Sequence, residues 1–444
     1  MKQRFRPMLV VLLGLCCSCA WAQVDTGGAS NPVTVQPGPV PAFTYPDATP
    51  SLDFLNESIE NSSITLGIGT GFSYFQSRGL FNVTPSIKIQ QFRSHLAWHI
   101  NYAGGYQAYT GGGSRTYSNM FSQRAGGGFV WQLAQHWQVL GDDNYIHSAN
   151  PFDSYLTTPG VPTINNPNPV TYYPLTQYTA NQGYLTLTDQ LSKADTLSFT
   201  GTAMLRNTSN FDVATAVPFY NVVSYGGLGA YSHRMSARLT LGGSYNYNSL
   251  DFGRGQQRSG VQTISFTADY LIRPGMTISG WVGPQYTSTK TVVFIPPVNP
   301  IEVLTSHDSL WSVAAGANFS WQSPRNAFRA GFFRRVQDGG GLTATSEVNS
   351  ANATYRRMLA KKWDGLAGIN FVHDVSTTST ARTATNLYTT LGLSYKPIKS
   401  VDVAADYAYQ RVNQSNTIVL GPSNYTNNRV SITASYSWTH PLGR

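Results

Sequence analysis

The ten residues Arg429–Trp438, RVSITASYSW, alternate between polar and apolar side chains without a break. Successive side chains of a β-strand point to opposite faces, so this stretch predicts a strand with two different faces. The apolar face carries Val430, Ile432, Ala434, Tyr436 and Trp438, and the polar face carries Arg429, Ser431, Thr433, Ser435 and Ser437. Two aromatic rings at one end of the apolar face are typical of side chains anchored at an interface.

The same alternation recurs along most of the chain. The clearest further runs are 64–74, 95–108, 238–248, 310–322, 386–396 and 401–410. They span about 10–14 residues, whereas the usual strand of a globular protein spans about 5–6. A strand that crosses a bilayer at a tilt needs about 9–11 residues, so the runs predict membrane-crossing strands.

The connections between the runs alternate between short and long. Short ones include 134–136, 273–275 and 323–325, and long ones include 150–177, 207–218, 291–307 and 413–426. Such asymmetry is typical of a transmembrane antiparallel up-and-down β-barrel with short turns on one side and long loops on the other. Counting the runs predicts about 18 strands, with about 16 as the alternative because 80–92 alternates less clearly.

The composition agrees with strands that have one face in lipid and one in water. Of the 444 residues, 11% are charged, against about 25% in an ordinary soluble domain. Aromatic residues make up 13%, yet the mean hydropathy is −0.21. A helical membrane protein would need apolar runs of about 20 residues, which are absent after the N-terminus. A soluble all-β protein is the alternative with the same composition.

Residues 1–22 have the pattern of a secretory signal peptide. A basic start with Lys2, Arg4 and Arg6 precedes an apolar stretch, and Ala20-Trp21-Ala22 forms a small-x-small cleavage site before Gln23. All three cysteines, Cys16, Cys17 and Cys19, would be removed with it, so we expect no disulfide and no thiolate metal site. Lipoprotein processing at Cys19 is the alternative. Residues 23–61 then form a Pro-rich periplasmic segment, and 62–444 form the barrel.

This layout resembles a bacterial outer-membrane β-barrel of the porin type. The last strand resembles the assembly signal of that family, with Ser431 as the polar residue and Tyr436 and Trp438 as the terminal aromatic pair. It departs from the pattern at Thr433, where the family has glycine, and in the six residues that follow Trp438. The resemblance implies an integral protein of the outer membrane, in contact with lipid and lipopolysaccharide and inserted by the barrel-assembly machinery. A second similarity, to barrels associated with exopolysaccharide export, implies a periplasmic export complex as a further partner.

Parity along the strands assigns several charged side chains to the lumen. The basic candidates for lining a pore are Lys88, Arg124, Arg206, Arg238, Arg329, Arg335, Arg356, Lys396 and Arg429. Acidic residues assigned to the same face are Asp269, Asp364, Asp374, Asp402 and Asp406. Rings of Arg or Lys make a pore favour anions, so we expect a mild anion preference. The alternative is that these charges pair across neighbouring strands and only solvate the lumen.

The longest loop, Asn150–Gln177, joins the fifth and sixth predicted strands. In general porins this connection holds the constriction loop, and the resemblance implies that Tyr155, Tyr172 and Tyr173 narrow the lumen. An outer cap is the alternative. The lumen-facing rings Trp281, Phe333 and Tyr388 are candidates for sugar stacking, and other Trp residues for interface girdles. The run Gly126–Gly128 lies inside a strand, where glycine permits a bend or a bulge.

An enzyme would need converging acid and base groups. Asp142, Asp143 and His147 loosely resemble the sets of outer-membrane proteases, but parity sends Asp142 and Asp143 to opposite faces, and His373 and Asp374 likewise. We therefore expect no catalytic site, and likewise no metal, cofactor or nucleic acid. The function predicted is passive diffusion of small hydrophilic solutes. The alternatives are a conduit for an anionic exopolysaccharide and a surface hydrolase.

Overall fold

The computed structural model describes residues 62–75, 78–93, 95–110, 120–148, 177–209, 221–252, 257–295, 302–339, 343–377, 383–415 and 424–441. The predicted signal peptide 1–22 and the Pro-rich segment 23–61 lie outside the described residues. Among the described residues, no helix is long and apolar enough to cross a membrane.

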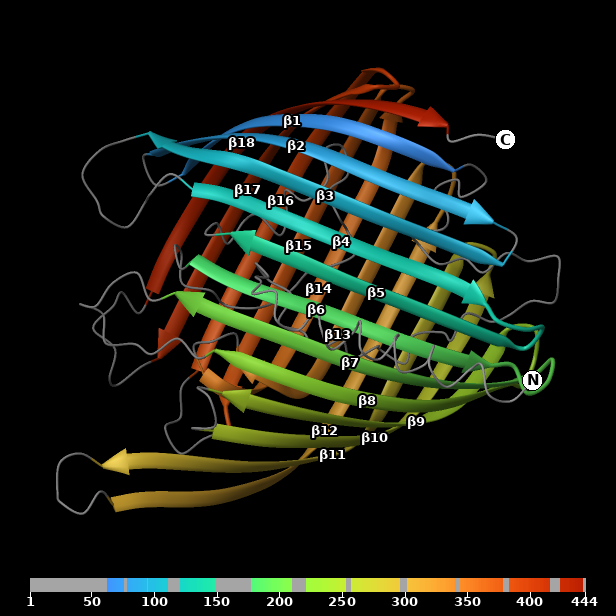
Figure 1. The fold of residues 1–444 in the computed structure, drawn as a ribbon, viewed down its shortest axis with the longest axis vertical. Helices are drawn as coiled ribbons and strands as arrows, with labels where there is room; N and C mark the ends of the chain where they lie inside the picture. The colour runs from blue at the N-terminus through green and yellow to red at the C-terminus, as the bar shows by residue number, and fades with distance from the viewer. Residues whose placement is uncertain are drawn as a thin grey trace, which may run out of the picture.

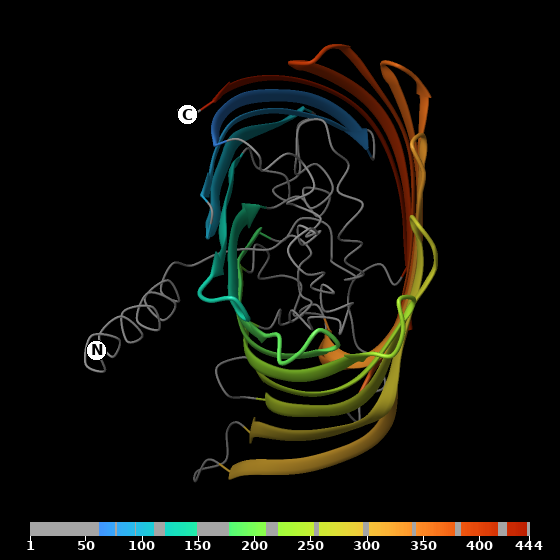
Figure 2. The ribbon, with the colours of Figure 1, turned by 90° about the vertical axis from the view of Figure 1, so that its right-hand side faces the viewer.

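The strands form one closed antiparallel sheet of 18 strands (Figure 1). Their bounds are β1 Ser63–Phe75, β2 Arg78–Arg93, β3 Leu96–Thr110, β4 Met120–Gln132, β5 Trp137–Ser148, β6 Gln177–Asp189, β7 Asp195–Ser209, β8 Val222–Arg234, β9 Leu239–Phe252, β10 Gln257–Arg273, β11 Met276–Ile295, β12 Glu302–Gln322, β13 Asn326–Gly339, β14 Thr343–Ala360, β15 Trp363–Ser376, β16 Thr383–Ile398, β17 Val401–Ser415 and β18 Asn424–Pro441. Each strand pairs with its sequence neighbours, and β1 pairs with β18. The weakly alternating region 80–92 lies in a full strand, β2, which decides for 18 strands over 16. The predicted up-and-down barrel is confirmed, and Figure 2 shows it end-on.

The stretch RVSITASYSW is the centre of β18, and it closes the barrel against β1. Ala434 lies opposite Thr70, and Tyr436 lies opposite Ile68. Ile432 is 57% exposed, whereas Arg429 is 3% exposed. The two faces predicted for this strand are therefore confirmed, with the apolar face outside and the polar face inside.

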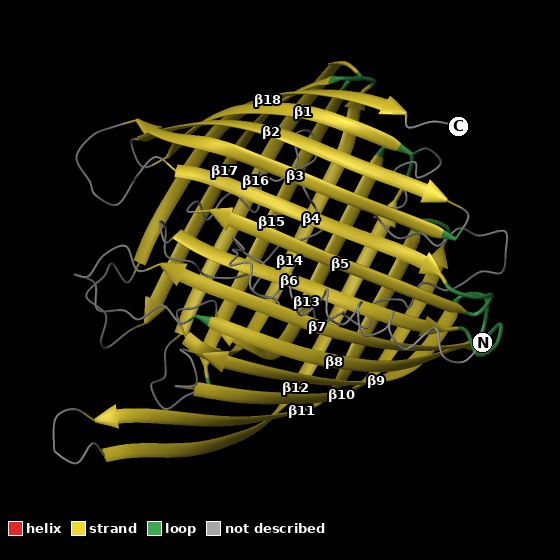
Figure 3. Cartoon of the chain, in the orientation of Figure 1, coloured by secondary structure: helices red, strands yellow, loops and turns green. Residues whose placement is uncertain are grey.

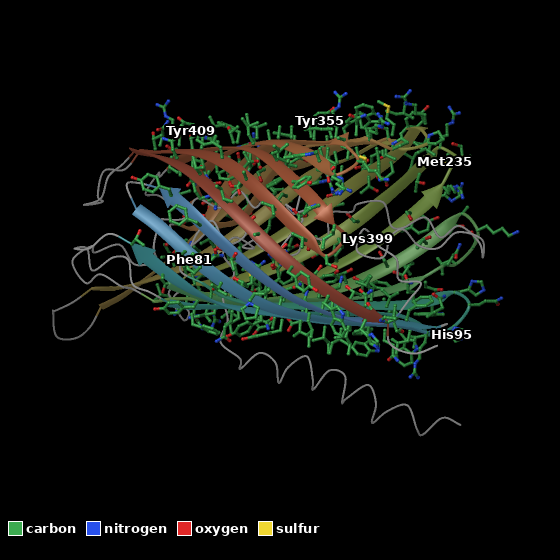
Figure 4. The ribbon with its side chains drawn as sticks, turned by 90° about the horizontal axis from the view of Figure 1, so that it is seen from above. Phe81, His95, Met235, Tyr355, Lys399 and Tyr409 are labelled. Carbon is green, nitrogen blue, oxygen red and sulfur yellow. The ribbon has the colours of Figure 1, made fainter. Side chains whose placement is uncertain are left out.

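The outside of the wall carries the large apolar side chains of the other strands too. Exposed examples are Leu66, Ile100, Phe199, Ile264, Val313 and Phe371. In Figure 4, Phe81, Tyr355 and Tyr409 lie among the side chains that crowd the outer surface. A soluble barrel would turn such side chains inward, so this arrangement excludes the soluble all-β alternative. Where neighbouring strands pair, the ladder also satisfies their backbone N–H and C=O groups, which a wall in contact with lipid requires.

Short turns join the strands at the end of the barrel where β1 begins and β18 ends. One of them is Pro274-Gly275, in which Gly275 has a φ of 77°, a conformation that favours glycine. Its carbonyl oxygen accepts a hydrogen bond from the N–H of Gln322, 2.7 Å away, which ties this turn to the end of β12.

Part of the predicted loop 291–307 is strand, which corrects the sequence-based expectation. β11 continues to Ile295 and β12 begins at Glu302, so the two form a ribbon that extends past the ends of the other strands (Figure 3). Residues 305–309 of this ribbon, TSHDS, are polar on both faces and exposed. The apolar–polar alternation ends where a strand leaves lipid, because water then lies on both faces, so the alternation could not mark this extension.

Candidate functional site

The inner wall holds all but one of the predicted pore-lining basic residues. The parity of the strand ladder puts these side chains on the inner face: Lys88, Arg124, Arg206, Arg329, Arg356, Lys396 and Arg429. Arg335 has the same parity on β13, at a position beyond the end of the β12–β13 ladder. Arg238 differs from the expectation, because β9 begins one residue later, at Leu239. The Ser236 hydroxyl accepts hydrogen bonds from the N–H groups of Arg238 and Leu239, which holds Arg238 in the turn before the strand.

Arg429 is held by a carboxylate of the neighbouring strand. Its Nη2 lies 2.9 Å from Oδ2 of Asp406 on β17, and its side chain is only 4% exposed. The Ser431 hydroxyl donates to the other oxygen of Asp406. The Asp406 carboxylate is therefore shared by two donors of β18, and the guanidinium it holds is turned into the wall instead of projecting freely into the lumen.

Two more ion pairs lie on the same side of the barrel. Arg356 Nη2 on β14 is 3.0 Å from Asp364 Oδ2 on β15. Lys396 Nζ at the end of β16 is 3.5 Å from Asp402 Oδ2 on β17. Together with Arg429 and its partner, these pairs make β14–β18 a wall on which basic and acidic groups alternate.

The opposite wall brings together a histidine and a carboxylate that sequence reasoning did not combine. His99 on β3 and Asp142 on β5 both face inward, and their Nε2 and Oδ2 atoms are 3.9 Å apart. Asn144 donates its amide to the other oxygen of Asp142. The two side chains meet although a whole strand, β4, separates β3 from β5.

Glycines of β4 make this meeting possible. A Cβ atom at Gly128 would lie 2.7 Å from Asp142 Oδ2 and 2.8 Å from His99 Cε1. One step along the same face, a Cβ at Gly126 would lie 2.6 Å from the amide oxygens of Asn101 and Asn144. The pairing of β4 with β3 and β5 is regular through Gly126–Gly128, so the expected bend or bulge is corrected. These glycines instead leave space over β4 for side chains of its two neighbours.

The residues of the hydrolase alternative do not converge. Asp143 and His147 lie on the outer face of β5, opposite to the inward Asp142, and Asp143 Oδ2 accepts a hydrogen bond from Asn181 at 3.1 Å. His373 also faces outward and lies 3.0 Å from the Thr385 hydroxyl. In the described part of the chain, no group of three or more His, Cys, Asp or Glu side chains is placed to hold a metal ion.

The three candidate sugar-stacking rings lie on the inner face, but each is packed against the wall. The Trp281 indole lies over Gly316, whose Cβ would fall 2.6 Å from its Cε2 atom. Tyr388 is 5% exposed. The Phe333 ring is covered by the guanidinium of Arg335 at 4.6 Å from the ring centroid. The aromatic rings outside form pairs instead, such as Tyr286 with Trp311 at 5.0 Å.

The two surfaces of the wall decide where this protein resides. Its outside is apolar and bears aromatic pairs, its inside is polar and bears ion pairs, and the ladder has no open end between β1 and β18. The chain is an integral β-barrel of the outer membrane. A polar interior that lipid never reaches is what allows such weakly apolar strands to form a membrane-spanning wall.

Three solved structures illustrate what this barrel is similar to. OpdQ of Pseudomonas aeruginosa is 13% identical, with a TM-score of 0.40 over 86% of this chain and 99% of that one. OccAB2 of Acinetobacter baumannii is 12% identical, with a TM-score of 0.41 over 86% and 98%. The ferric citrate transporter FecA is 9% identical, with a TM-score of 0.43 over 85% and 79%. No protein-family model and no curated protein matches the chain. At TM-scores below 0.5, the fold assignment rests on the strand ladder of this chain itself.

Two predicted features of the barrel have different outcomes. The assembly-signal residues lie on β18, with Tyr436 and Trp438 exposed on the outside and Ser431 buried inside. Trp438 also stacks on His440, with ring centroids 5.5 Å apart. The constriction-loop candidates Tyr155 and Tyr172, together with Tyr173, lie outside the described residues.

Proposed function

We propose that the barrel is an outer-membrane channel for passive diffusion of small hydrophilic solutes, with a mild anion preference. The observation that carries the proposal is the polar inner wall, which is enclosed by a closed ladder and separated from an apolar exterior. Solutes that hydrogen-bond to water find equivalent partners along such a wall. Outer-membrane lipid, lipopolysaccharide and the barrel-assembly machinery are the proposed partners, the last through Ser431, Tyr436 and Trp438.

The anion preference follows from the balance of charge on the inner face. Among the residues that the structure describes, the inward basic side chains outnumber the inward acidic ones, but Arg356, Lys396 and Arg429 each pair with an aspartate. Pairing lowers the net field at those positions, so the preference should be mild. A conduit for an anionic exopolysaccharide would be favoured by a continuous basic track along the lumen, and the alternation of charges on β14–β18 does not favour it.

Reversal potentials test this proposal. The refolded protein is inserted into a planar bilayer with a gradient of potassium chloride, and detergent alone serves as the control. A reversal potential shifted toward that of chloride is the expected result. A potential shifted toward that of potassium contradicts the anion preference, and the absence of any conductance contradicts the channel.

A further inference from the structure

The ladder between β12 and β13 covers only Ala315–Gln322 of β12, which itself begins at Glu302. Pairing runs from Gln322 with Ala327 only as far as Ala315 with Arg334. The ladder between β11 and β12 continues to Ile295 with Glu302, so residues 302–314 of β12 pair on one side only among the described residues. An open strand edge has backbone groups ready to pair with another strand.

The outer ends of β13 and β14 do not follow β12. They lie on the inner side of β10 and β11. We call this end the tongue, and define it as residues 335–339 of β13 with 343–348 of β14. Backbone N–H of Val336 donates to Gln285 Oε1 at 2.7 Å, and the hydroxyls of Ser259 and Thr345 are 2.7 Å apart. Ser259 and Gln285 point into the barrel, so the tongue forms a second layer inside the wall. In Figure 2, an orange strand end lies within the curve of the yellow-green strands.

Buried apolar contacts hold the tongue in this position. Val336 is 4% exposed and belongs to one cluster with side chains from the inner faces of β7–β10. The other members of that cluster are Met204, Val222, Leu250, Phe252 and Val261. This cluster gives part of the inner wall an apolar lining, which the tongue covers.

Gln285 acts as a positioning residue for the tongue. Its Oε1 accepts a hydrogen bond from the N–H of Val336, and its Nε2 donates to the Thr263 hydroxyl at 3.0 Å. A backbone N–H at this edge of β13 would otherwise need a partner on a neighbouring strand. The Gln285 side chain thus replaces the backbone partner that β12 would provide.

The same segment fits the open edge of β12. If the β12–β13 register continued unchanged beyond Ala315 and Arg334, Val313 would lie opposite Val336 and Ala314 opposite Arg335. The edge of β12 is open over this whole length among the described residues. Two arrangements of one strand end, each with its own partners, are the requirement for a two-state element.

We propose that the tongue is a movable constriction of the channel. When the tongue lies inward, it narrows the outer half of the lumen. When it pairs with β12 instead, it completes the wall and widens the lumen. This inference rests on the proposed channel function for its effect on conductance, while the movement itself is independent of that function.

Two disulfide staples test the movement. The chain has only Cys16, Cys17 and Cys19, all within the predicted signal peptide, so introduced pairs have no competing thiols. S259C with T345C should hold the tongue inward, and V313C with V336C should hold it on β12. A317C with F332C is the matched control, because these residues already pair on the same two strands. Oxidation of each pair in the folded, heat-modifiable protein is followed by gel migration.

The expected result is that both test staples form, and that the V313C–V336C staple raises single-channel conductance roughly twofold because it widens the lumen at the tongue. The S259C–T345C staple should keep the low level, and reduction should return both proteins to the unstapled level. Formation of the control staple without the V313C–V336C staple overturns the movement, and equal conductance of the two stapled forms overturns the constriction. Staples that form in a barrel without conductance contradict the channel alone, since the movement is then established.

Q285A gives a second measurement. Loss of the side chain that holds Val336 should speed formation of the V313C–V336C staple several-fold. Q262A is the control, since Gln262 lies on the outward face of β10. Equal rates in Q285A and Q262A would show that Gln285 does not hold the tongue.

Discussion

The guanidinium of Arg429 reaches diagonally across the β17–β18 ladder to Asp406, since its direct partner on β17 is Ala408. Ser431 lies directly opposite Asp406 and donates to the same carboxylate. The Asp406 carboxylate is therefore held by two residues of β18, the strand that closes the barrel.

Removing the carboxylate should destabilise this seam. Asp406→Asn leaves the guanidinium of Arg429 with a weaker acceptor in a site where its side chain is 4% exposed. We expect a loss of about 2 kcal/mol, less than the roughly 3–5 kcal/mol for a fully buried pair, because Asp406 itself is 26% exposed. Urea unfolding in lipid vesicles measures the loss. Pairing Asp406→Asn with Arg429→Gln should cost less than the sum of the single changes, and strict additivity would contradict the coupling.

Charge on the outer face of β18 should cost far more than charge on its inner face. Ala434 faces lipid between Thr70 of β1 and Val403 of β17. Ala434→Lys should lower the free energy of unfolding by about 2–4 kcal/mol. The matched control is Ser435→Lys, whose side chain enters the aqueous lumen and should have a mild effect. Similar losses at the two positions would contradict the assignment of faces.

A methyl group at Gly128 should push the side chains of His99 and Asp142 apart. The new Cβ would meet both side chains and also approach the Gly141 carbonyl oxygen at 3.1 Å. Gly128→Ala should therefore cost about 1–3 kcal/mol, as overpacking of a filled site does. Gly201→Ala is the control, because a Cβ there meets nothing within 4 Å. Thermal loss of the heat-modifiable band on a gel compares the two, and equal midpoints would contradict the close packing over β4.

Lys88 should contribute to anion preference. It faces inward on β2 and is exposed, so its charge acts on solutes in the lumen. Lys88→Gln should move the reversal potential in a salt gradient toward zero, with little change in unfolding. Lys290→Gln is the control, since Lys290 faces outward on the β11–β12 ribbon. An unchanged potential in Lys88→Gln, or an equal shift in both variants, would assign the selectivity to other residues.

The repeated alternation was sufficient to predict the closed sheet. Each run such as 310–322 reports directly which side chains face lipid, and the β1–β18 pairing follows once the strand number is even. Alternation is required only where one face of a strand meets lipid and the other meets water, so it predicts no strand beyond the lipid. Residues 305–309 of β12 are polar and exposed on both faces, so a loop was expected over 291–307 in place of a ribbon.

The candidate site depends on distances between side chains, and the parity of residues along a strand does not predict such distances. Sequence reasoning could say that His99 and Asp142 both face inward, but not that Gly128 lies between them. Their meeting requires the register of three strands at once, and a shift of two residues in one ladder keeps every face assignment while separating the pair. The ion pair of Arg429 with Asp406 has the same origin.

The strand RVSITASYSW by itself determined the two faces of the wall, because alternation is a property of local backbone geometry and of the solvents on either side. Only the tertiary structure decided which charges pair, which glycines lie beneath side chains, and where β13 leaves β12. Those outcomes depend on register and on contacts between residues far apart in the chain, such as Ser259 with Thr345. Local alternation predicts neither the register nor these contacts, since any register that preserves parity satisfies it equally well.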